Sequence, residues 1–338
     1  MKAQFHGALL ATAVLLSPLM TSAPRAEVAE LRMATQYGIG TLPMVLVQKN
    51  QLLEKHLAAA GLGSVKVSWR QFPGGNPMNE GLLSGSLDIV SGGTTVFLTL
   101  WAKAKGTPSA VRGIGAVSGL PLYLLTRDPN VHKFTDLGPN DRISVTTLRV
   151  SVHAILLQIA ADKFWGPGSE ERINKLTVQL PHGDAAAVMI SGAGEVNNHF
   201  SAPPFQDIEL KKEGIRKISS EQDILGTRAT YMVAYTTEKF RNKNPKAYKA
   251  FVDALNEAHE LIKKDPAGVA KIYLEHSKDK ISVDEAVAII KNPGSTFTMA
   301  PSGVMPFAAF MAKAGIIKTA PTSWKDMFFP EVQGMSGS

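Results

Sequence analysis

An arginine and a serine stand where a predicted strand gives way to a predicted helix. The β-branched run 143–147 is followed by Leu-Arg-Val-Ser and then by apolar residues spaced three and four apart. Arg149 and Ser151 therefore fall at a helix start, where unpaired N–H groups and partial positive charge favour anions. A guanidinium can bind a carboxylate or a sulfonate through two parallel N–H bonds. We predict that Arg149, Ser151 and His153 contact a ligand; the alternative for Arg149 is a surface salt bridge.

Loops rich in glycine and hydroxyl residues follow three other predicted strands. Such residues let the backbone approach a ligand closely and offer amide and hydroxyl donors. Ligands of open α/β sheets bind beyond the carboxyl ends of the strands, so these loops supply candidate contacts. The candidates are Gln36, Tyr37, Thr41, Gly74, Gly75, Asn76, Gly93, Thr94 and Thr95. Alternatives remain open: helix capping for Thr94 and Thr95, an ordinary turn for 74–76, and loop cover for Tyr37.

Three histidines raise the question of a metal site. His153, His182 and His199 lie near predicted loop ends, and Phe200 and Ser201 follow the last of them. Their separations of 29 and 17 residues contain no i, i+4 pair, so we predict no metal and count all five residues as candidate ligand contacts. The chain has no cysteine and no G-x-S-x-G segment. Thiol catalysis and a serine nucleophile elbow are thereby excluded, and we predict no catalytic residue and no cofactor.

Strands and helices alternate along the chain. The first predicted strand (31–35) precedes helical spacing over 42–60, and further strand–loop–helix units cover 65–83 and 87–104. A second series begins near residue 128, and the apolar stretch 229–236 is predicted to return to the first sheet, with helices after it. Such alternation is typical of mostly parallel sheets covered by helices, so the predicted fold class is α/β.

Composition and the first residues limit the function classes. The 338 residues carry a formal net charge of +7, but lysine and arginine are scattered and aromatic residues make up only 7%, so we predict no nucleic-acid binding. Residues 1–26 combine a basic start with a short apolar run over 7–20. This pattern predicts a secretory signal peptide cut after Ala26 and a soluble chain in the periplasm; the alternative is a buried N-terminal helix.

Three ordered stretches carry a resemblance to a known family. They are QYGIGTLP, WRQFPGGNPMNEGLLSGSLDIVSGGTTVFL and FTDLGPNDRISVTTLRVSVHAILL. Together they resemble the periplasmic substrate-binding proteins of ABC importers, of the nitrate, sulfonate and taurine type, over residues 30 to 315. The resemblance implies a two-lobed fold of the periplasmic-binding-protein type II, in which each lobe is a mostly parallel sheet flanked by helices.

The resemblance also implies a division of the chain and a mode of action. Lobe one would comprise residues 30–118 and 228–338, and lobe two residues 119–227 with both crossing segments. Gln36 stands at the position from which the family reaches the ligand head group. The protein would be a monomer that binds a small ligand between the lobes and delivers it to a membrane permease.

The loop after residue 199 narrows the predicted ligand. Amine-binding relatives carry an acidic residue there, whereas this chain has HFSAPPF, so a ligand ammonium would find no counter-charge in that loop. The aromatic residues Tyr37, Trp69, Phe200 and Phe205 suit an anion with an apolar body, either a sulfonate or a carboxylate. The alternatives are a ligand-sensing module for a receptor, or an enzyme on the same fold, although the enzymes in question use cysteine.

Overall fold

Two five-stranded sheets form the centres of two lobes. The computed structural model describes Met1 and residues 27–338, so the predicted signal peptide lies outside the described residues apart from Met1. Lobe one is built on the sheet β2-β1-β3-β10-β4, and lobe two on the sheet β7-β6-β8-β5-β9. The strands are β1 (Glu30–Thr35), β2 (Lys66–Gln71), β3 (Ile89–Gly93), β4 (Val111–Ser118), β5 (Tyr123–Thr126), β6 (Ile143–Val145), β7 (Thr177–Gln179), β8 (Asn198–Ser201), β9 (Arg216–Ser220) and β10 (Met232–Thr237).

The sheet of lobe one mixes parallel and antiparallel pairing. Strand β1 pairs in parallel with β2 and β3, while β10 runs antiparallel between β3 and β4. The predicted return of the chain to the first sheet is confirmed by β10. Strand β10 is buried almost throughout because helices cover both faces of this sheet.

Lobe two repeats this arrangement. Strand β6 pairs in parallel with β7 and β8, and β5 runs antiparallel between β8 and β9. The chain crosses from lobe one to lobe two between β4 and β5, and it returns between β9 and β10. Both crossings therefore lie beside the two antiparallel strands.

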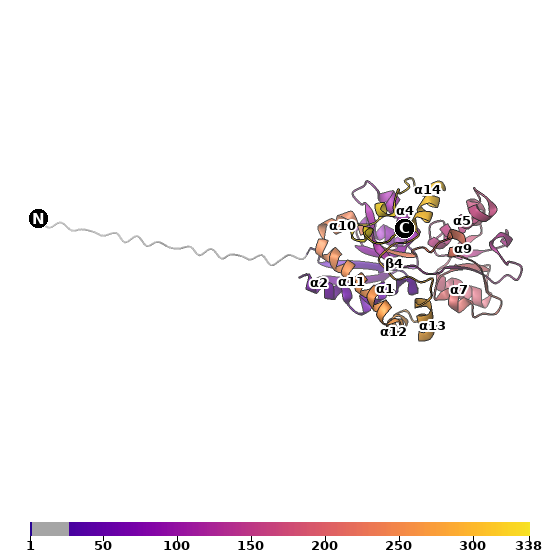
Figure 1. Cartoon of the computed structure of the whole chain (residues 1–338), viewed down its shortest axis with the longest axis horizontal. Helices are drawn as coiled ribbons and strands as arrows, with labels where there is room; N and C mark the ends of the chain where they lie inside the picture. The colour runs from indigo at the N-terminus through magenta and orange to yellow at the C-terminus, as the bar shows by residue number, and fades with distance from the viewer. Residues whose placement is uncertain (2–26) are drawn as a thin grey trace.

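Helices cover both sheets. In lobe one, α4 and α14 lie on one side of the sheet and α1 and α11 on the other (Figure 1). The helices of lobe one are α1 (Leu42–Lys49), α2 (Leu52–Ala59), α3 (Asn76–Ser84), α4 (Thr94–Ala104), α10 (Glu238–Lys243), α11 (Pro245–Lys264), α12 (Pro266–Ser277), α13 (Val283–Ile290), α14 (Val304–Lys313) and α15 (Pro330–Gln333). Those of lobe two and its return crossing are α5 (Val152–Trp165), α6 (Glu170–Asn174), α7 (His182–Ser191), α8 (Phe205–Glu209) and α9 (Glu221–Leu225). Within residues 27–338, none of these helices has the length and apolar character needed to cross a bilayer.

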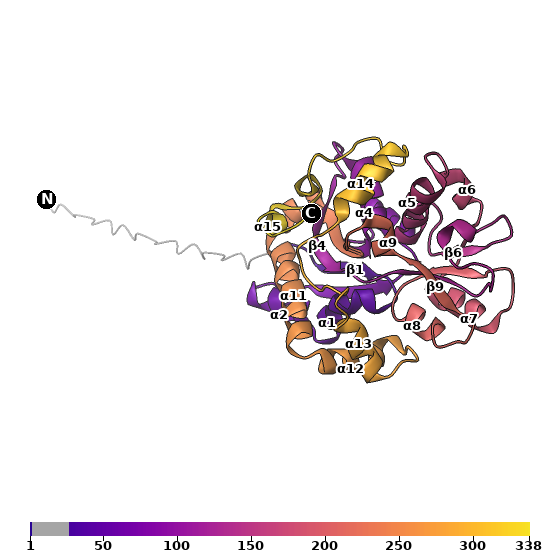
Figure 2. The same ribbon diagram turned by 45° about the vertical axis from the view of Figure 1, so that its right-hand side comes forward.

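The lobes touch along two edges. Helices α4 and α14 lie beside α5 at one edge, and α12 and α13 lie near α8 at the other (Figure 2). Buried apolar residues of both lobes form one continuous cluster, and polar contacts also join the lobes. Thr95 Oγ1 donates to the Val150 carbonyl at 2.6 Å, and Lys313 pairs with Asp162 at 2.8 Å.

Two details of the predicted elements are wrong. The predicted helix 42–60 is divided into α1 and α2, because Gln51 adopts a left-handed φ of 51° that ends the first helix. The short helices α6, α8, α9 and α10 were not predicted, since five or six residues show too little periodicity.

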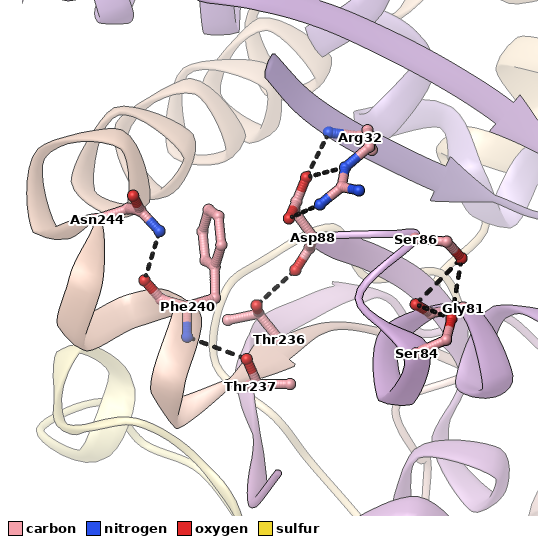
Figure 3. A network of polar contacts seen from close by, with 9 residues as sticks. All are labelled: Arg32, Gly81, Ser84, Ser86, Asp88, Thr236, Thr237, Phe240 and Asn244. Atoms are coloured by element: carbon pink, nitrogen blue, oxygen red, sulfur yellow. Dashed lines mark hydrogen bonds and ion pairs between the residues drawn. The ribbon is translucent and has the colours of Figure 1, made fainter. Parts of the chain in front are cut away.

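A polar network ties the β1 and β3 strands together at the edge remote from the other lobe. Asp88 accepts hydrogen bonds from the backbone N–H of Arg32 at 2.9 Å and from its guanidinium at 2.7 and 2.8 Å (Figure 3). The Asp88 backbone carbonyl accepts from Thr236 Oγ1 in β10 (Figure 3). Asp88 therefore joins the three central strands of lobe one.

Replacing Asp88 with asparagine is expected to lower the free energy of unfolding by about 1.5–3 kcal/mol, because charge-assisted bonds to Arg32 are lost. Chemical denaturation measures this change. The matched control is Glu30→Gln, whose carboxylate pairs with exposed Lys66 at 3.5 Å and whose loss should leave the midpoint unchanged. Equal midpoints for both variants would contradict the structural role of Asp88.

Candidate functional site

A cavity of about 280 Å³ lies between the two lobes. Lobe one contributes residues 36–41, which follow β1, and residues 273–279 at the end of α12. Lobe two contributes residues 181–184 at the start of α7, together with Phe205. Residues following β1, β2, β6 and β7 all line it, so the cavity lies at the carboxyl ends of parallel strands from both sheets. Ligands of α/β sheets bind at this position.

Four of the sequence-predicted residues line this cavity. Gln36, Tyr37 and Thr41 come from lobe one, and His182 comes from lobe two. The Gln36 side-chain oxygen accepts from the Gly93 amide at 3.2 Å, and Thr41 Oγ1 donates to the Gly38 carbonyl at 2.9 Å. Tyr37 is 55% exposed, so its ring can cover a ligand without displacing packed side chains.

His182 is held in place by aromatic rings. The Phe205 ring stacks on it, with centroids 5.7 Å apart and an interplanar angle of 21°. His153 meets it edge-on at 4.6 Å, and the His153 ring also contacts Phe200 and Tyr231. The predicted candidates His153 and Phe200 are thus fully buried beside His182 and do not line the cavity themselves.

A buried chain of hydrogen bonds runs behind His182. His182 Nδ1 lies 2.8 Å from His199 Nε2, and His199 Nδ1 lies 2.9 Å from Glu209 Oε1. Ser201 Oγ donates to the second Glu209 oxygen at 2.7 Å. His199 and Ser201 reach the same carboxylate because alternate residues of β8 point to one face, and α8 places Glu209 against that face. We call this set, His182–His199–Glu209, the histidine chain.

Burial affects the protonation of two of these rings. Burial, with a smaller contribution from the neighbouring His199, lowers the pKa of His153 to about 3. Burial also lowers the pKa of His182 well below its usual value, with smaller contributions from His153 and His199. Both rings are therefore neutral at physiological pH in the free protein. In the described part of the chain, no three histidine, aspartate or glutamate side chains converge as a metal site would require.

Acidic side chains line the cavity. Asp184 lies in the first turn of α7, and Asp279 accepts from the Tyr273 hydroxyl. Among the described lining residues there is no lysine or arginine. The prediction that a ligand ammonium finds no counter-charge considered only residues 199–205, and it missed these two carboxylates because they come from other elements.

Arg149 does not lie at the cavity. Its guanidinium pairs with Glu171 of α6 at 3.0 and 3.1 Å, and its side chain is 60% exposed. The reason is local: Arg149 adopts a left-handed φ of 65°, and the Gln158 side-chain amide donates a hydrogen bond to its backbone carbonyl. The structure therefore places Arg149 in the surface salt bridge that was the alternative.

We expect the Arg149→Ala variant to retain the ligand affinity of the unaltered protein within about twofold, because exposed ion pairs contribute little and no ligand contact is lost. Isothermal titration calorimetry with a ligand that the unaltered protein binds measures this affinity. A loss of tenfold or more would show that Arg149 reaches the ligand after all.

The hydroxyl residues at the helix starts bind the backbone. Thr94 Oγ1 donates to the Thr230 carbonyl at 2.6 Å, and Thr95 Oγ1 donates to Val150 across the lobes. Ser151 caps α5 by accepting from the Ala154 amide at 3.3 Å. Thr94 thus stabilises the return crossing, Thr95 the contact between the lobes, and Ser151 the start of α5. All three side chains lie outside the cavity lining.

The glycines beside these helices serve close packing. Gly93 approaches Val152 so closely that an added Cβ would lie 3.1 Å from its methyl group, and a Cβ at Gly75 would lie 2.5 Å from Val96. Gly74 lies against Thr147 of lobe two. Asn76 is exposed at the start of α3, and neither it nor Trp69 lines the cavity.

Several residues at the site were not identified from sequence. Glu209 lies in the unpredicted helix α8, and Tyr231 lies in the return crossing. Tyr273 and His276 belong to a helix whose pattern indicates only an apolar face. Only the tertiary fold brings the end of α12 to the cavity. Glu209 had one usable signal, a carboxylate between Ile208 and Leu210, ten residues after His199.

Comparison with known proteins places these observations in context. No protein-family model matches the chain. A segment of 105 residues is 36% identical to an Escherichia coli (strain K12) protein that is named, provisionally, an aliphatic sulfonates-binding protein. The segment is 31% of this chain and spans only 30% of that protein.

Solved structures match over much more of the chain. The alkanesulfonate-binding protein of Xanthomonas axonopodis pv. citri, bound to MOPS, has a TM-score of 0.67 at 20% identity, covering 88% of this chain and 96% of that one. The periplasmic aliphatic sulphonate binding protein of Escherichia coli has a TM-score of 0.66 at 18% identity, covering 90% and 98%. The periplasmic nitrate-binding protein of Synechocystis PCC 6803 has a TM-score of 0.64 at 13% identity, covering 89% and 84%. The chain therefore has the two-lobed α/β fold of the periplasmic binding proteins.

Proposed function

We propose that the protein is the periplasmic solute-binding component of an ABC importer. It captures a small organic anion between its lobes and delivers it to a permease in the inner membrane. The observation that carries this proposal is the cavity between the lobes, which four strand ends and the start of α7 line. The sulfonate- and nitrate-binding proteins that share the fold support it, and so does the predicted signal peptide. We assign no reaction to the protein.

The polar contacts between the lobes suit a protein that opens and closes. Lys313 with Asp162, and Lys211 with Glu285, are ion pairs of exposed lysines that water can replace at small cost. A ligand that contacts both lobes would then shift the population toward the closed form, which a permease can distinguish from the open one.

A short sulfonate or carboxylate fits the chemistry of the lining. In the first turn of α7, the amides of residues 182–184 have no intrahelical acceptor, and they lie at the positive end of the helix dipole. Tyr37 and Phe205 offer apolar area for the body of the ligand. We therefore propose a sulfonate or carboxylate with an apolar tail as the ligand.

Thermal-shift measurements on the purified protein test this proposal. We expect ethanesulfonate, longer alkanesulfonates or benzoate to raise the melting temperature. A ligand present at 100 times its Kd stabilises the folded state by about 2.7 kcal/mol, a shift of several degrees. The matched control is ethylammonium, which has the same tail and the opposite charge. If only the ammonium raises the melting temperature, the anion proposal is wrong.

A further inference from the structure

The proposed anion meets an electrostatic difficulty in this cavity. Asp184 and Asp279 line it, and no lysine or arginine does so among the described lining residues. Glu209 lies behind His182 with 0% of its surface exposed. A ligand charge brought into this environment needs a compensating positive charge or it is strongly disfavoured.

The histidine chain can supply that charge. His182 is 92% buried and lines the cavity, and its Nε2 has no hydrogen-bond partner among the described residues. Its other nitrogen, Nδ1, is occupied by His199. Nε2 is itself buried, so it is an unsatisfied polar atom beside the unpaired amides at the start of α7, and it needs a partner that the described side chains do not supply.

Counting protons shows what an anion requires. In the first state, His199 donates its Nδ1–H to the Glu209 carboxylate and accepts from His182 Nδ1–H, so His182 Nε2 is a bare lone pair. This state repels an anion. For Nε2 to carry a hydrogen while every bond of the chain is kept, the chain must hold one more proton. The conclusion is the same whether that proton resides on His199, Glu209 or His182.

We propose that the protein takes up one proton together with its anionic ligand, and that His182 Nε2–H is the donor which the anion selects. This inference rests on the proposed function. His182 is the residue that contacts the ligand, and His199 and Glu209 are positioning residues that set its tautomer. In the ligand-bound state the histidine chain is neutral overall, whereas in the free state it carries the charge of Glu209. The proton thus offsets the charge of the ligand.

Other titratable groups face His182 or the cavity and are alternative proton acceptors. His153 packs against His182 from α5, but its neighbours Phe200 and Tyr231 offer no carboxylate to stabilise its cation. His276 lies on the lobe-one wall, 3.3 Å from Gln71 Nε2. Asp184 and Asp279 complete the set. Unlike these groups, the histidine chain combines a nitrogen of a cavity-lining residue, unpartnered within the described part of the protein, with a buried carboxylate.

Calorimetry measures the proton directly. We expect 1-butanesulfonate binding at pH 8 to give a heat that varies with the ionisation enthalpy of phosphate, imidazole and Tris buffers, with a slope of about one proton taken up. Affinity should fall about tenfold per pH unit above pH 8. Sulfonate buffers must be avoided because they are candidate ligands themselves.

Variants assign the proton to the histidine chain. In Glu209→Gln the amide N–H₂ can donate to His199 Nδ1, which fixes Nε2–H on both rings without an extra proton. This variant should bind the sulfonate with no proton uptake and with an affinity that changes less than twofold between pH 7 and pH 9. His276→Gln and Asp184→Asn remove alternative proton acceptors from the same cavity, and each should retain the uptake of one proton even where its affinity changes.

The outcomes are separable. A buffer-independent heat for the unaltered protein overturns the inference and leaves the proposed function standing. Loss of proton uptake in His276→Gln or Asp184→Asn, with uptake retained in Glu209→Gln, overturns it as well. If no sulfonate or carboxylate produces heat at all, the proposed ligand class is wrong and the inference falls with it.

Discussion

Replacing Glu209 with alanine is expected to lower the free energy of unfolding by about 3–5 kcal/mol. Glu209 accepts hydrogen bonds from His199 and Ser201, and all three side chains are fully buried. Removing the carboxylate leaves a ring nitrogen and a hydroxyl without partners, and it also opens a cavity. Denaturant unfolding followed by circular dichroism measures the loss.

Two controls separate this effect from general sensitivity of the α8 region. Glu213→Ala removes an exposed carboxylate four residues later and should leave the midpoint unchanged. Glu209→Gln keeps the side-chain volume and can still form hydrogen bonds to His199 and Ser201. Its loss of unfolding free energy should therefore be clearly smaller than that of Glu209→Ala. A loss below about 1 kcal/mol in Glu209→Ala would mean that His199 and Ser201 find other partners.

Replacing Glu221 with glutamine is expected to stabilise the protein at alkaline pH. Glu221 begins the return crossing between the lobes, and its carboxylate accepts from the Ala229 amide at 2.7 Å. Burial raises the pKa of Glu221 to about 7, although the Ala229 hydrogen bond and Arg228 oppose the increase. The folded protein therefore holds this proton more tightly than the unfolded chain does.

The sign of the pH dependence follows from this difference. Between the ordinary glutamate pKa of 4.5 and about 7, the folded state binds more protons, so the contribution of Glu221 to stability falls as the pH rises. Glutamine does not titrate and can still accept from Ala229. The free energy of unfolding of the variant should equal that of the unaltered protein near pH 4.5 and exceed it by about 3 kcal/mol at pH 8.

Denaturation of both proteins at pH 4.5, 6 and 8 tests this prediction. The comparison isolates Glu221 because other groups with a raised pKa, such as Asp207 at about 6, contribute equally to both proteins. A stability difference that does not change with pH would show that Glu221 ionises freely in the folded state.

The alternating architecture was predictable because each element carries its own pattern. The apolar stretch around Tyr235 predicts a central strand, and it lies between β3 and β4 with 0% exposure of the tyrosine. Ser151 signals a helix start, and it caps α5. Gln36 and His182 were identified because strand ends of an α/β sheet collect at one edge.

The position of Arg149 away from the cavity has a conformational cause. Sequence places it at the end of β6, but the direction of its side chain depends on a left-handed φ that few non-glycine residues adopt. The contribution of Tyr273 and Asp279 could not be predicted for another reason: they reach the cavity only because α12 packs on α1, α11 and α13. Hydrophobic periodicity defines the buried face of a helix and carries no information about what its end will meet.

The interrupted sheet of lobe one affects the order in which the chain can fold. Strand β10 lies between β3 and β4 in that sheet, yet it is separated from β4 in sequence by all of lobe two. During synthesis, lobe two has all its strands before β10 emerges, whereas β4 has no strand to pair with in lobe one until β10 joins it to β3. Lobe two is therefore free to form first. The late insertion of β10 between β3 and β4 then completes the sheet of lobe one, whose first strands are synthesised before lobe two.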